Sequence, residues 1–167
     1  FFPGSFQQLF PHQFFFRLDE VDRRLLRALQ NDGRISNLEL AQICNLSTSS
    51  CSERVRRLRD QGYITGFTAV LDPTKVGRAL LIFVEVLLER TTADVFESFA
   101  AAARRAPEVL ECHMVAGGFD YLIKARVADM AAYRGFLGDI LVNMPGVRET
   151  RTYAVLEEIK STSALPI

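Results

Sequence analysis

Apolar residues recur every three or four positions in the first part of the chain, which is the spacing of helices that bury one face. The first predicted helix covers residues 18–31 and ends at the sequence Asn31-Asp32-Gly33. Acidic residues in its first turn suit the positive end of the helix dipole. Its inward-facing positions are Leu18, Val21, Leu25, Leu26 and Leu29.

Two shorter helices are predicted to follow, and each starts at a serine. Ser36 can accept a hydrogen bond from the main-chain N–H of Glu39, whose own side chain completes a capping box. This helix ends near Cys44, and Ser47 begins a third helix that runs to Gly62. Three short helices joined by tight turns indicate a helix-turn-helix unit.

The third helix has two chemically different sides when it is projected at about 100° per residue. Cys51, Val55 and Leu58 fall on one side and can pack on the first two helices. Small residues let a helix approach the floor of the major groove, and arginines offer charged donors to phosphates and base edges. A solvated arginine-rich face and a protein-binding module are the alternatives at this point. The side that predicts DNA contact carries Ser49, Ser50, Glu53, Arg56 and Arg57.

Residues 63–70 alternate enough to form a short hairpin or wing after the third helix. Residues 18–71 are therefore predicted to be a winged helix-turn-helix domain, with double-stranded DNA as its partner. The predicted DNA-binding residues are Ser36, Ser47, Thr48, Ser49, Ser50, Arg54, Arg56 and Arg57.

The periodicity changes after Asp72-Pro73, so residues 72–78 are predicted to be a linker. In residues 79–167, apolar runs typical of strands alternate with two amphipathic helices. The expected order is strand 80–88, helix 94–105, strand 109–116, strand 120–127, a helix capped by Asp129, and strand 147–159. This β-α-β-β-α-β order is that of the ferredoxin-like fold, an antiparallel sheet with both helices on one face. The predicted fold class is α+β.

The first strand is apolar on both faces, although the domain's own helices should cover only one of them. Leu80, Ile82, Val84 and Val86 point one way, and Leu81, Phe83 and Leu87 point the other way. An exposed apolar patch marks an interface, which predicts a dimer formed through the open face of the sheet. Such a dimer would place two recognition helices on one two-fold DNA site. The alternative is that loops or helices cover this face.

The connection between the second and third strands has the composition of a small ligand site. Gly117 and Gly118 permit a positive φ and close approach of main-chain amides, which can bind a carboxylate. Asp120 offers a counter-charge for an ammonium group, and Thr150 and Thr152 add hydroxyls if they project toward the loop. This combination suits an α-amino acid, although Gly-Gly beside Asp is also ordinary hairpin chemistry.

The overall charge and the cysteines narrow the class of protein. Twenty basic residues balance twenty acidic ones, with a pI near 6.9, so the chain is not a protein that binds polyanions over its whole surface. Cys44, Cys51 and Cys112 form no C-x-x-C pair, which favours reduced thiols in a cytoplasm over disulfides or a zinc site. No apolar run reaches the roughly 18 residues of a membrane span, so no membrane partner is expected.

Catalytic motifs are missing from the sequence, and no catalytic residue, cofactor or metal is expected. Outside the first sixteen residues the one histidine is His113, which is predicted to be structural because it lies within an apolar strand. Those sixteen residues, FFPGSFQQLFPHQFFF, are uncharged and aperiodic and carry seven of the thirteen phenylalanines. Residues 1–17 are therefore predicted to be a disordered leader, or one foreign to the natural protein, and are left out of both domains.

Four long blocks of the sequence resemble the Lrp/AsnC (feast/famine) family of bacterial transcription regulators. They are DGRISNLELA, CSERVRRLRDQGYITGFTAVLDP, ECHMVAGGFDYLIKARVADMAAYRGFLG and MPGVRETRTYAVLEEIK, within a resemblance that runs from about residue 18 onward. The resemblance implies a helix-turn-helix joined to a ferredoxin-like domain that dimerises, builds octamers or other rings of dimers, and binds amino acids between dimers. It makes residues 47–59 the recognition helix and residues 117–120 the effector loop.

The expected function is therefore an amino-acid-responsive regulator that binds promoter DNA as a homo-oligomer. An architectural DNA-binding protein with little effector response, an activator of one amino-acid catabolic operon such as proline use, and an enzyme built on the sheet domain are the alternatives. The predicted effector-binding residues are Met114, Ala116, Gly117, Gly118, Phe119, Asp120, Thr150 and Thr152.

Overall fold

The computed structural model describes residues 18–167 and divides into a helical unit and a sheet unit. The helical unit ends at Ala69 but also includes Thr162–Ile167, and the sheet unit is Val70–Ser161. The predicted second domain, residues 79–167, includes residues 162–167, whereas the structure groups these residues with the helical unit. The leader prediction concerns residues that lie outside the described part of the chain.

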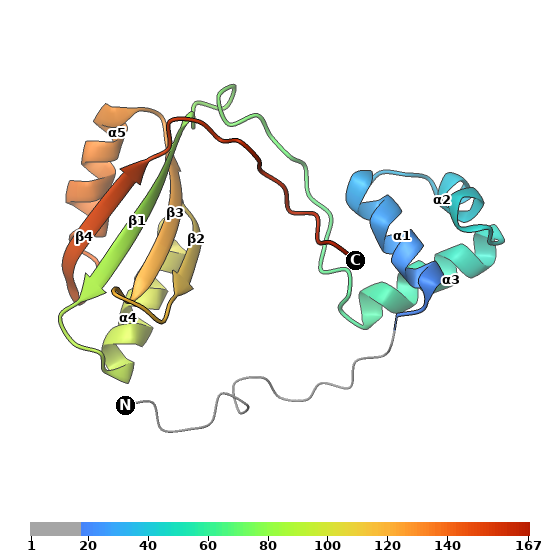
Figure 1. The fold of residues 1–167 in the computed structure, drawn as a ribbon, viewed down its shortest axis with the longest axis horizontal. Helices are drawn as coiled ribbons and strands as arrows, with labels where there is room; N and C mark the ends of the chain where they lie inside the picture. Colours follow the sequence, from blue (N-terminus) through green and yellow to red (C-terminus); the bar gives the residue numbers. More distant parts are fainter. Residues whose placement is uncertain (1–17) are drawn as a thin grey trace. The chain divides into compact units, whose positions relative to one another are not determined.

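The helical unit contains the three helices that the sequence predicts, shown in blue to blue-green in Figure 1. They are α1 (Glu20–Asn31), α2 (Asn37–Cys44) and α3 (Thr48–Asp60). Ser36 and Ser47 cap α2 and α3 as predicted, and Ser36 forms the expected capping box with Glu39. The cap of α1 is Asp19, whose side chain accepts the main-chain N–H of Asp22 at 2.7 Å.

The core of the helical unit joins the inward faces of all three helices. Leu25, Cys51 and Leu58 are completely buried, and Leu40 is 1% exposed. Cys51 and Leu58 occupy the side of α3 that the projection placed inward. The opposite side of α3 is consequently left at the surface of this unit.

The predicted hairpin at residues 63–70 is wrong, because no strand occurs in that segment. The main-chain N–H groups of Tyr63 and Ile64 both donate to the Leu58 carbonyl, so the chain leaves α3 in a turn. Gly66 does not adopt the positive φ that tight hairpin turns require. Without that turn the alternating residues have no partner strand.

The sheet unit has the predicted β-α-β-β-α-β order (Figure 1). Its four strands form one antiparallel sheet in the order β2-β3-β1-β4. The elements are β1 (Leu80–Leu88), α4 (Ala93–Arg105), β2 (Val109–Met114), β3 (Tyr121–Val127), α5 (Met130–Gly135), the π-helical segment η2 (Phe136–Leu141) and β4 (Val147–Ala154). Asp129 caps α5 as predicted, accepting two main-chain N–H groups at 2.8 Å.

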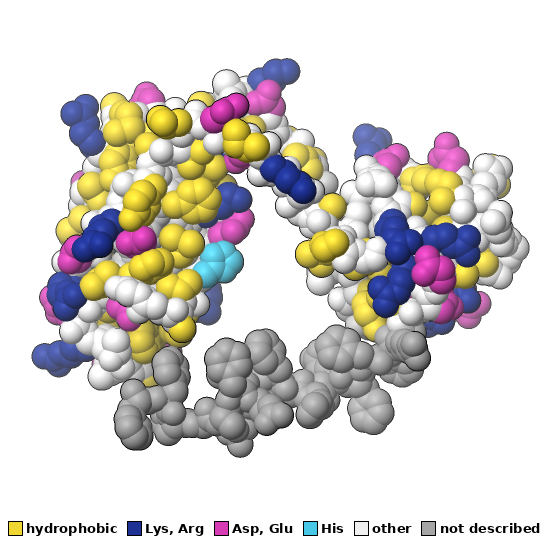
Figure 2. All heavy atoms as spheres, viewed as in Figure 1, with side chains coloured by type: hydrophobic (Ala, Val, Ile, Leu, Met, Phe, Trp, Pro, Cys, Tyr) yellow, Lys and Arg dark blue, Asp and Glu magenta, His cyan; other side chains and the backbone are white. Residues whose placement is uncertain are grey.

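One face of this sheet is packed against its helices. Ile82, Val84 and Val86 of β1 are completely buried, in one cluster with Phe99 of α4 and Phe136 of η2. Alternate residues of β1 lie on the other face, where Phe83 and Leu87 are half-buried. The helices lie behind the sheet in Figure 1, so the view in Figure 2 looks onto this open face, where apolar side chains are spread among charged ones.

The last strand is shorter than predicted, ending at Ala154 rather than at residue 159. The main-chain N–H of Val155 still donates to the Leu81 carbonyl, but β1 begins at Leu80 and offers no further partner. The next residue, Leu156, is fully exposed. Leu81, expected on the open face, is only 5% exposed beside this contact.

No helix within residues 18–167 is long and apolar enough to cross a membrane.

Candidate nucleic-acid interface and effector site

The N-terminus of α3 brings a group of small hydroxyl side chains to the surface. Ser47 accepts the N–H of Ser50 at 3.2 Å, and its hydroxyl lies 3.1 Å from that of Ser49. Thr48, Ser49 and Ser50 are all exposed, as a helix that enters a groove requires. Ser36 lies at the start of α2, where Glu39 binds its hydroxyl at 2.7 Å.

The arginines follow along the same helix. Arg56 and Arg57 are exposed, whereas Arg54 is half-buried. A surface hollow of about 500 Å³ is lined by Ser50, Glu53, Arg54, Arg56, Arg57, Asp60 and Gln61. The structure thus brings the predicted residues of α3 together on one face, mixed with two carboxylates.

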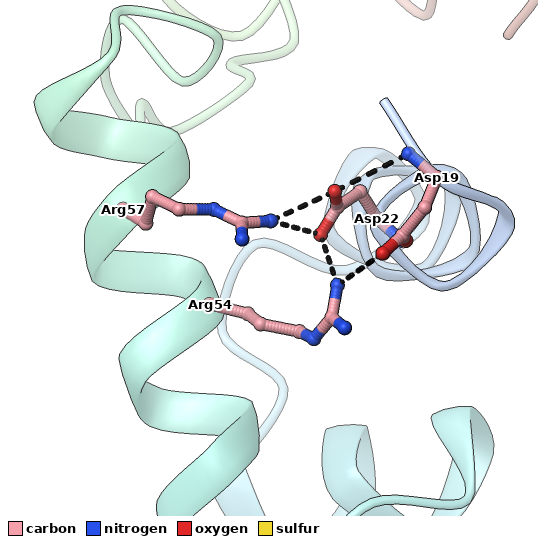
Figure 3. Close-up of polar contacts among 4 residues, drawn as sticks. All are labelled: Asp19, Asp22, Arg54 and Arg57. Atoms are coloured by element: carbon pink, nitrogen blue, oxygen red, sulfur yellow. Dashed lines mark hydrogen bonds and ion pairs between the residues drawn. The ribbon is translucent and has the colours of Figure 1, made fainter. Parts of the chain in front are cut away.

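Two of these arginines bind aspartates at the start of α1 (Figure 3). The Arg54 Nη1 donates to Asp22 Oδ1 at 2.8 Å and to Asp19 Oδ2 at 2.7 Å. The Arg57 Nη2 donates to both carboxylate oxygens of Asp22 at 2.8 Å. The Asp22 side chain is 5% exposed, so its charge is compensated by two guanidinium groups.

This cluster, Asp19, Asp22, Arg54 and Arg57, is called the N-terminal ion cluster below. The hydrogen bonds of the cluster also shift pKa values: the Arg54 guanidinium lowers the pKa of Asp19, helped by the main-chain N–H of Asp22. The two aspartates raise the pKa of Arg54. Sequence reasoning missed the cluster, because the partners are more than 30 residues apart and no local pattern joins them.

The predicted effector loop is a hairpin connection between β2 and β3. It is closed by the Val115 N–H, which donates to the Asp120 carbonyl at 3.0 Å. Gly117 and Gly118 do not adopt a positive φ, and nothing lies within 4 Å of a Cβ placed at either one. The glycines therefore leave open space beside exposed main chain, and do not serve a strained turn.

Asp120 is held at the end of β1. Its N–H donates to the Val86 carbonyl at 3.0 Å, and its carboxylate accepts the Leu88 N–H at 2.8 Å. On β4, Thr150 pairs with Val86 of β1, and Thr152 pairs with Val84 of β1. Both threonines thus lie on the helix-covered side of the sheet. Ala116 is exposed and Phe119 half-buried in the loop itself.

Met114 lies at the end of β2 and is 60% exposed. It belongs to a hollow of about 520 Å³ between β2 and α4 that is lined by Ala100, Ala103, Arg104, Val109, Leu110, Glu111, Cys112, Met114 and Tyr121. Met114 is therefore the predicted effector residue that borders both the loop and a concave surface.

His113 is exposed on β2, so the structure does not enclose it in an apolar strand as the sequence predicts. His113 lies 3.2 Å from Glu111, which also binds Lys124 at 2.8 Å. No group of three His, Cys, Asp or Glu that could hold a metal occurs within residues 18–167, and the three cysteines are free thiols.

Comparison with known proteins assigns both parts of the chain. Residues 18–65 match the winged helix-turn-helix DNA-binding model, and residues 81–165 match the Lrp/AsnC ligand binding domain. Over 150 residues the chain is 53% identical to the leucine-responsive regulatory protein of Salmonella typhimurium, covering 90% of this chain and 92% of that protein. The chain belongs to the Lrp/AsnC family.

Solved structures of regulatory proteins share the fold. A transcriptional regulator from Neisseria meningitidis in complex with L-methionine is 39% identical, with a TM-score of 0.86 over 90% of this chain and 97% of that one. The feast or famine regulatory protein of Mycobacterium tuberculosis, complexed with L-methionine, is 34% identical, with a TM-score of 0.80 over 89% and 99%. A DNA-binding domain and a ligand-binding domain are thus joined in this one chain. This is the architecture of a transcription regulator, and neither match indicates an enzyme.

Proposed function

We propose that the protein is a cytoplasmic, amino-acid-responsive transcription regulator that binds promoter DNA as a homo-oligomer. The observation that carries this proposal is that one chain joins a helix-turn-helix with an exposed serine- and arginine-bearing helix to an Lrp/AsnC ligand-binding domain. Its dimers form through the open face of the sheet and assemble into an octamer, with the effector bound between dimers.

The DNA contacts are supported by the surface of α3. Thr48, Ser49 and Ser50 leave space at the helix N-terminus, where main-chain N–H groups and hydroxyls can bind phosphate. Arg56 stands further along on the same exposed face. A second helix-turn-helix in the dimer doubles these contacts on a two-fold site.

The dimer contact is supported by the side chains on the open face. Phe83 pairs with Lys124 on one side and with Tyr153 on the other, and Tyr153 is 51% exposed. Leu87 and Leu122 are half-buried on the same face. A surface that interleaves aromatic and aliphatic side chains with charged ones such as Glu85 and Lys124 can form an interface that combines apolar contacts with ion pairs.

The effector site is supported by the loop between β2 and β3. Gly117 and Gly118 leave their amides approachable, the Asp120 carboxylate is fixed nearby, and Met114 supplies an apolar surface. Two structural relatives are complexed with L-methionine, so an amino acid with an unbranched apolar side chain is the first candidate.

Two measurements test this function in the full chain. A thermal-shift screen against the twenty L-amino acids should give at least one hit, since a ligand at 100 times its dissociation constant stabilises by about 2.7 kcal/mol. Selection from a random DNA pool should enrich a two-fold symmetric site. The proposal is contradicted if the selection enriches no sequence, DNA affinity falls steeply with salt and no amino acid stabilises the protein. Those results would indicate an architectural DNA-binding protein.

A further inference from the structure

The four arginines of α3 are not equivalent in the structure. Arg54 and Arg57 belong to the N-terminal ion cluster, whereas Arg56 and Arg59 form no ion pair with another described residue. The sequence predicts DNA contact for Arg54, Arg56 and Arg57 alike, because a local pattern does not reveal which distant side chain an arginine contacts. Their surroundings separate them into different roles.

Arg54 is committed to the aspartates. Its side chain is 28% exposed, and its Nη1 bridges Asp19 and Asp22. Turning this guanidinium toward DNA would leave the Asp22 carboxylate, which is 5% exposed, with one cation in place of two. A carboxylate removed from water is stabilised only while its charge-assisted hydrogen bonds persist, so the contact with Asp22 is hard to exchange for a phosphate.

Charge within the cluster also balances. Two carboxylates face two guanidinium groups, so an approaching phosphate meets little net charge at Arg54. The Arg57 side chain is 46% exposed, so it is more accessible than Arg54 although it also pairs with Asp22. Arg56 lies on the outer face of the helix and keeps its charge available.

The cluster joins the first turn of α1 to the middle of α3 (Figure 3). It therefore fixes the rotation of α3 about its own axis relative to α1, in addition to the apolar packing of Cys51 and Leu58. That rotation decides which side chains of α3 face a groove.

We propose that Arg54, through Asp22, is a positioning residue that orients the recognition helix without contacting DNA, and that Arg56 supplies the phosphate contact. This inference rests on the proposed DNA binding. It predicts that loss of Arg54 changes the stability but not the salt dependence of binding, and that loss of Arg56 changes the salt dependence but not the stability.

The test compares Arg54→Gln and Arg56→Gln in the full chain, using a 40-base-pair random-sequence duplex from 50 to 200 mM salt. Each lost phosphate contact should flatten the slope of log affinity against log salt by about 0.9 per helix-turn-helix bound. Arg56→Gln should flatten the slope in this way and leave the melting temperature unchanged. Arg54→Gln should lower the melting temperature and the affinity but keep the wild-type slope. A flattened slope at unchanged melting temperature for Arg54→Gln would overturn the proposal.

A second measurement uses the wild-type chain, so it does not depend on the folding of a variant. Phenylglyoxal modification followed by peptide mass analysis should label Arg56 in the free protein and spare it in the presence of the duplex. Arg54 should stay unlabelled in both states. Labelling of Arg54 that the duplex prevents would contradict the assignment, whereas a wild-type chain that ignores the duplex at 50 mM salt would instead contradict the proposed function.

Discussion

The side-chain amide of Gln30 forms two hydrogen bonds with the main chain of Leu165. Gln30 Oε1 accepts the Leu165 N–H at 2.6 Å, and Gln30 Nε2 donates to the Leu165 carbonyl at 3.1 Å. Beside it, the Arg27 guanidinium donates to the main-chain oxygen of Ile167, whose side chain packs against the helical core. This returning segment at the end of the chain therefore belongs to the helical unit and lies on the surface of α1.

Gln30→Ala should loosen this returning segment. Each neutral hydrogen bond contributes about 0.5–1.5 kcal/mol, so loss of the two should destabilise the helical unit by about 1–3 kcal/mol. Hydrogen exchange at the Leu165 amide should accelerate as well. Gln42→Ala is the control, because Gln42 is exposed on α2 and its side chain forms no hydrogen bond with a described residue. Unchanged exchange in Gln30→Ala would show that the segment is held by other contacts.

Acid should weaken the N-terminal ion cluster. Because Arg54 lowers the pKa of Asp19 in the folded state, the unfolded chain takes up this proton more readily. The stabilisation is present above the ordinary carboxyl pKa of about 3.9 and is lost as the pH falls through the lower folded value. Asp19→Asn keeps an N-cap but removes the charge, so its melting temperature should fall less than that of the wild type between pH 6 and pH 3. Glu97→Gln, an exposed position on α4 without an ion pair to a described residue, should keep the wild-type profile.

Alanine substitutions at Gly146 and Gly118 should separate an effect on stability from an effect on ligand binding. Gly146 has a φ of 75°, and a Cβ there would overlap the Val95 side chain. Gly146→Ala should destabilise the sheet unit by about 2–4 kcal/mol, from the left-handed backbone and the overpacking together. Gly118→Ala meets no atom and no backbone strain, so its melting temperature should match the wild type. If the loop binds the effector, Gly118→Ala should nevertheless abolish the thermal shift by the amino acid; a full shift would exclude Gly118 from the site.

The open face of the sheet should govern dimerisation. Phe83→Lys places a charge between Lys124 and Tyr153, and should raise the dimer dissociation constant by about 30-fold or more, as for other residues at the centre of an interface. Analytical ultracentrifugation measures this shift. Leu38→Lys, which replaces an apolar side chain that is 59% exposed on α2, is the matched control. Equal dissociation constants for the two variants would place the dimer contact elsewhere.

Local patterns in the sequence predict the elements well. The helix starts at Ser36, Ser47 and Asp129 are confirmed, because each cap depends on residues two or three positions away. The order of strands and helices along the chain is confirmed too, since apolar runs and amphipathic segments indicate it. The missing hairpin at residues 63–70 shows the limit, because alternation alone does not supply a partner strand.

The candidate sites depend on contacts between residues far apart in the sequence more than the helices and strands do. The pairing of Asp22 with Arg54 and Arg57, and of Gln30 with Leu165, joins segments that only the fold brings together. The sequence predicts that Asp120 faces a ligand, and the fold adds the Leu88 N–H, which donates a hydrogen bond to the Asp120 carboxylate and fixes it. Residue type and spacing predict which functional groups a segment offers. They do not predict which distant residue already forms a hydrogen bond with those groups.

Coupling between the two domains is the central claim, and DNA affinity with and without an amino acid tests it most directly. The measurement is fluorescence anisotropy on the duplex recovered by selection, with L-methionine, L-leucine or the best thermal-shift hit, and with the D-enantiomer as control. A coupling free energy of about 1–3 kcal/mol predicts a change in dissociation constant of roughly 5- to 150-fold with the L-amino acid alone. An identical dissociation constant in all these conditions, with the amino acid demonstrably bound, would contradict the account.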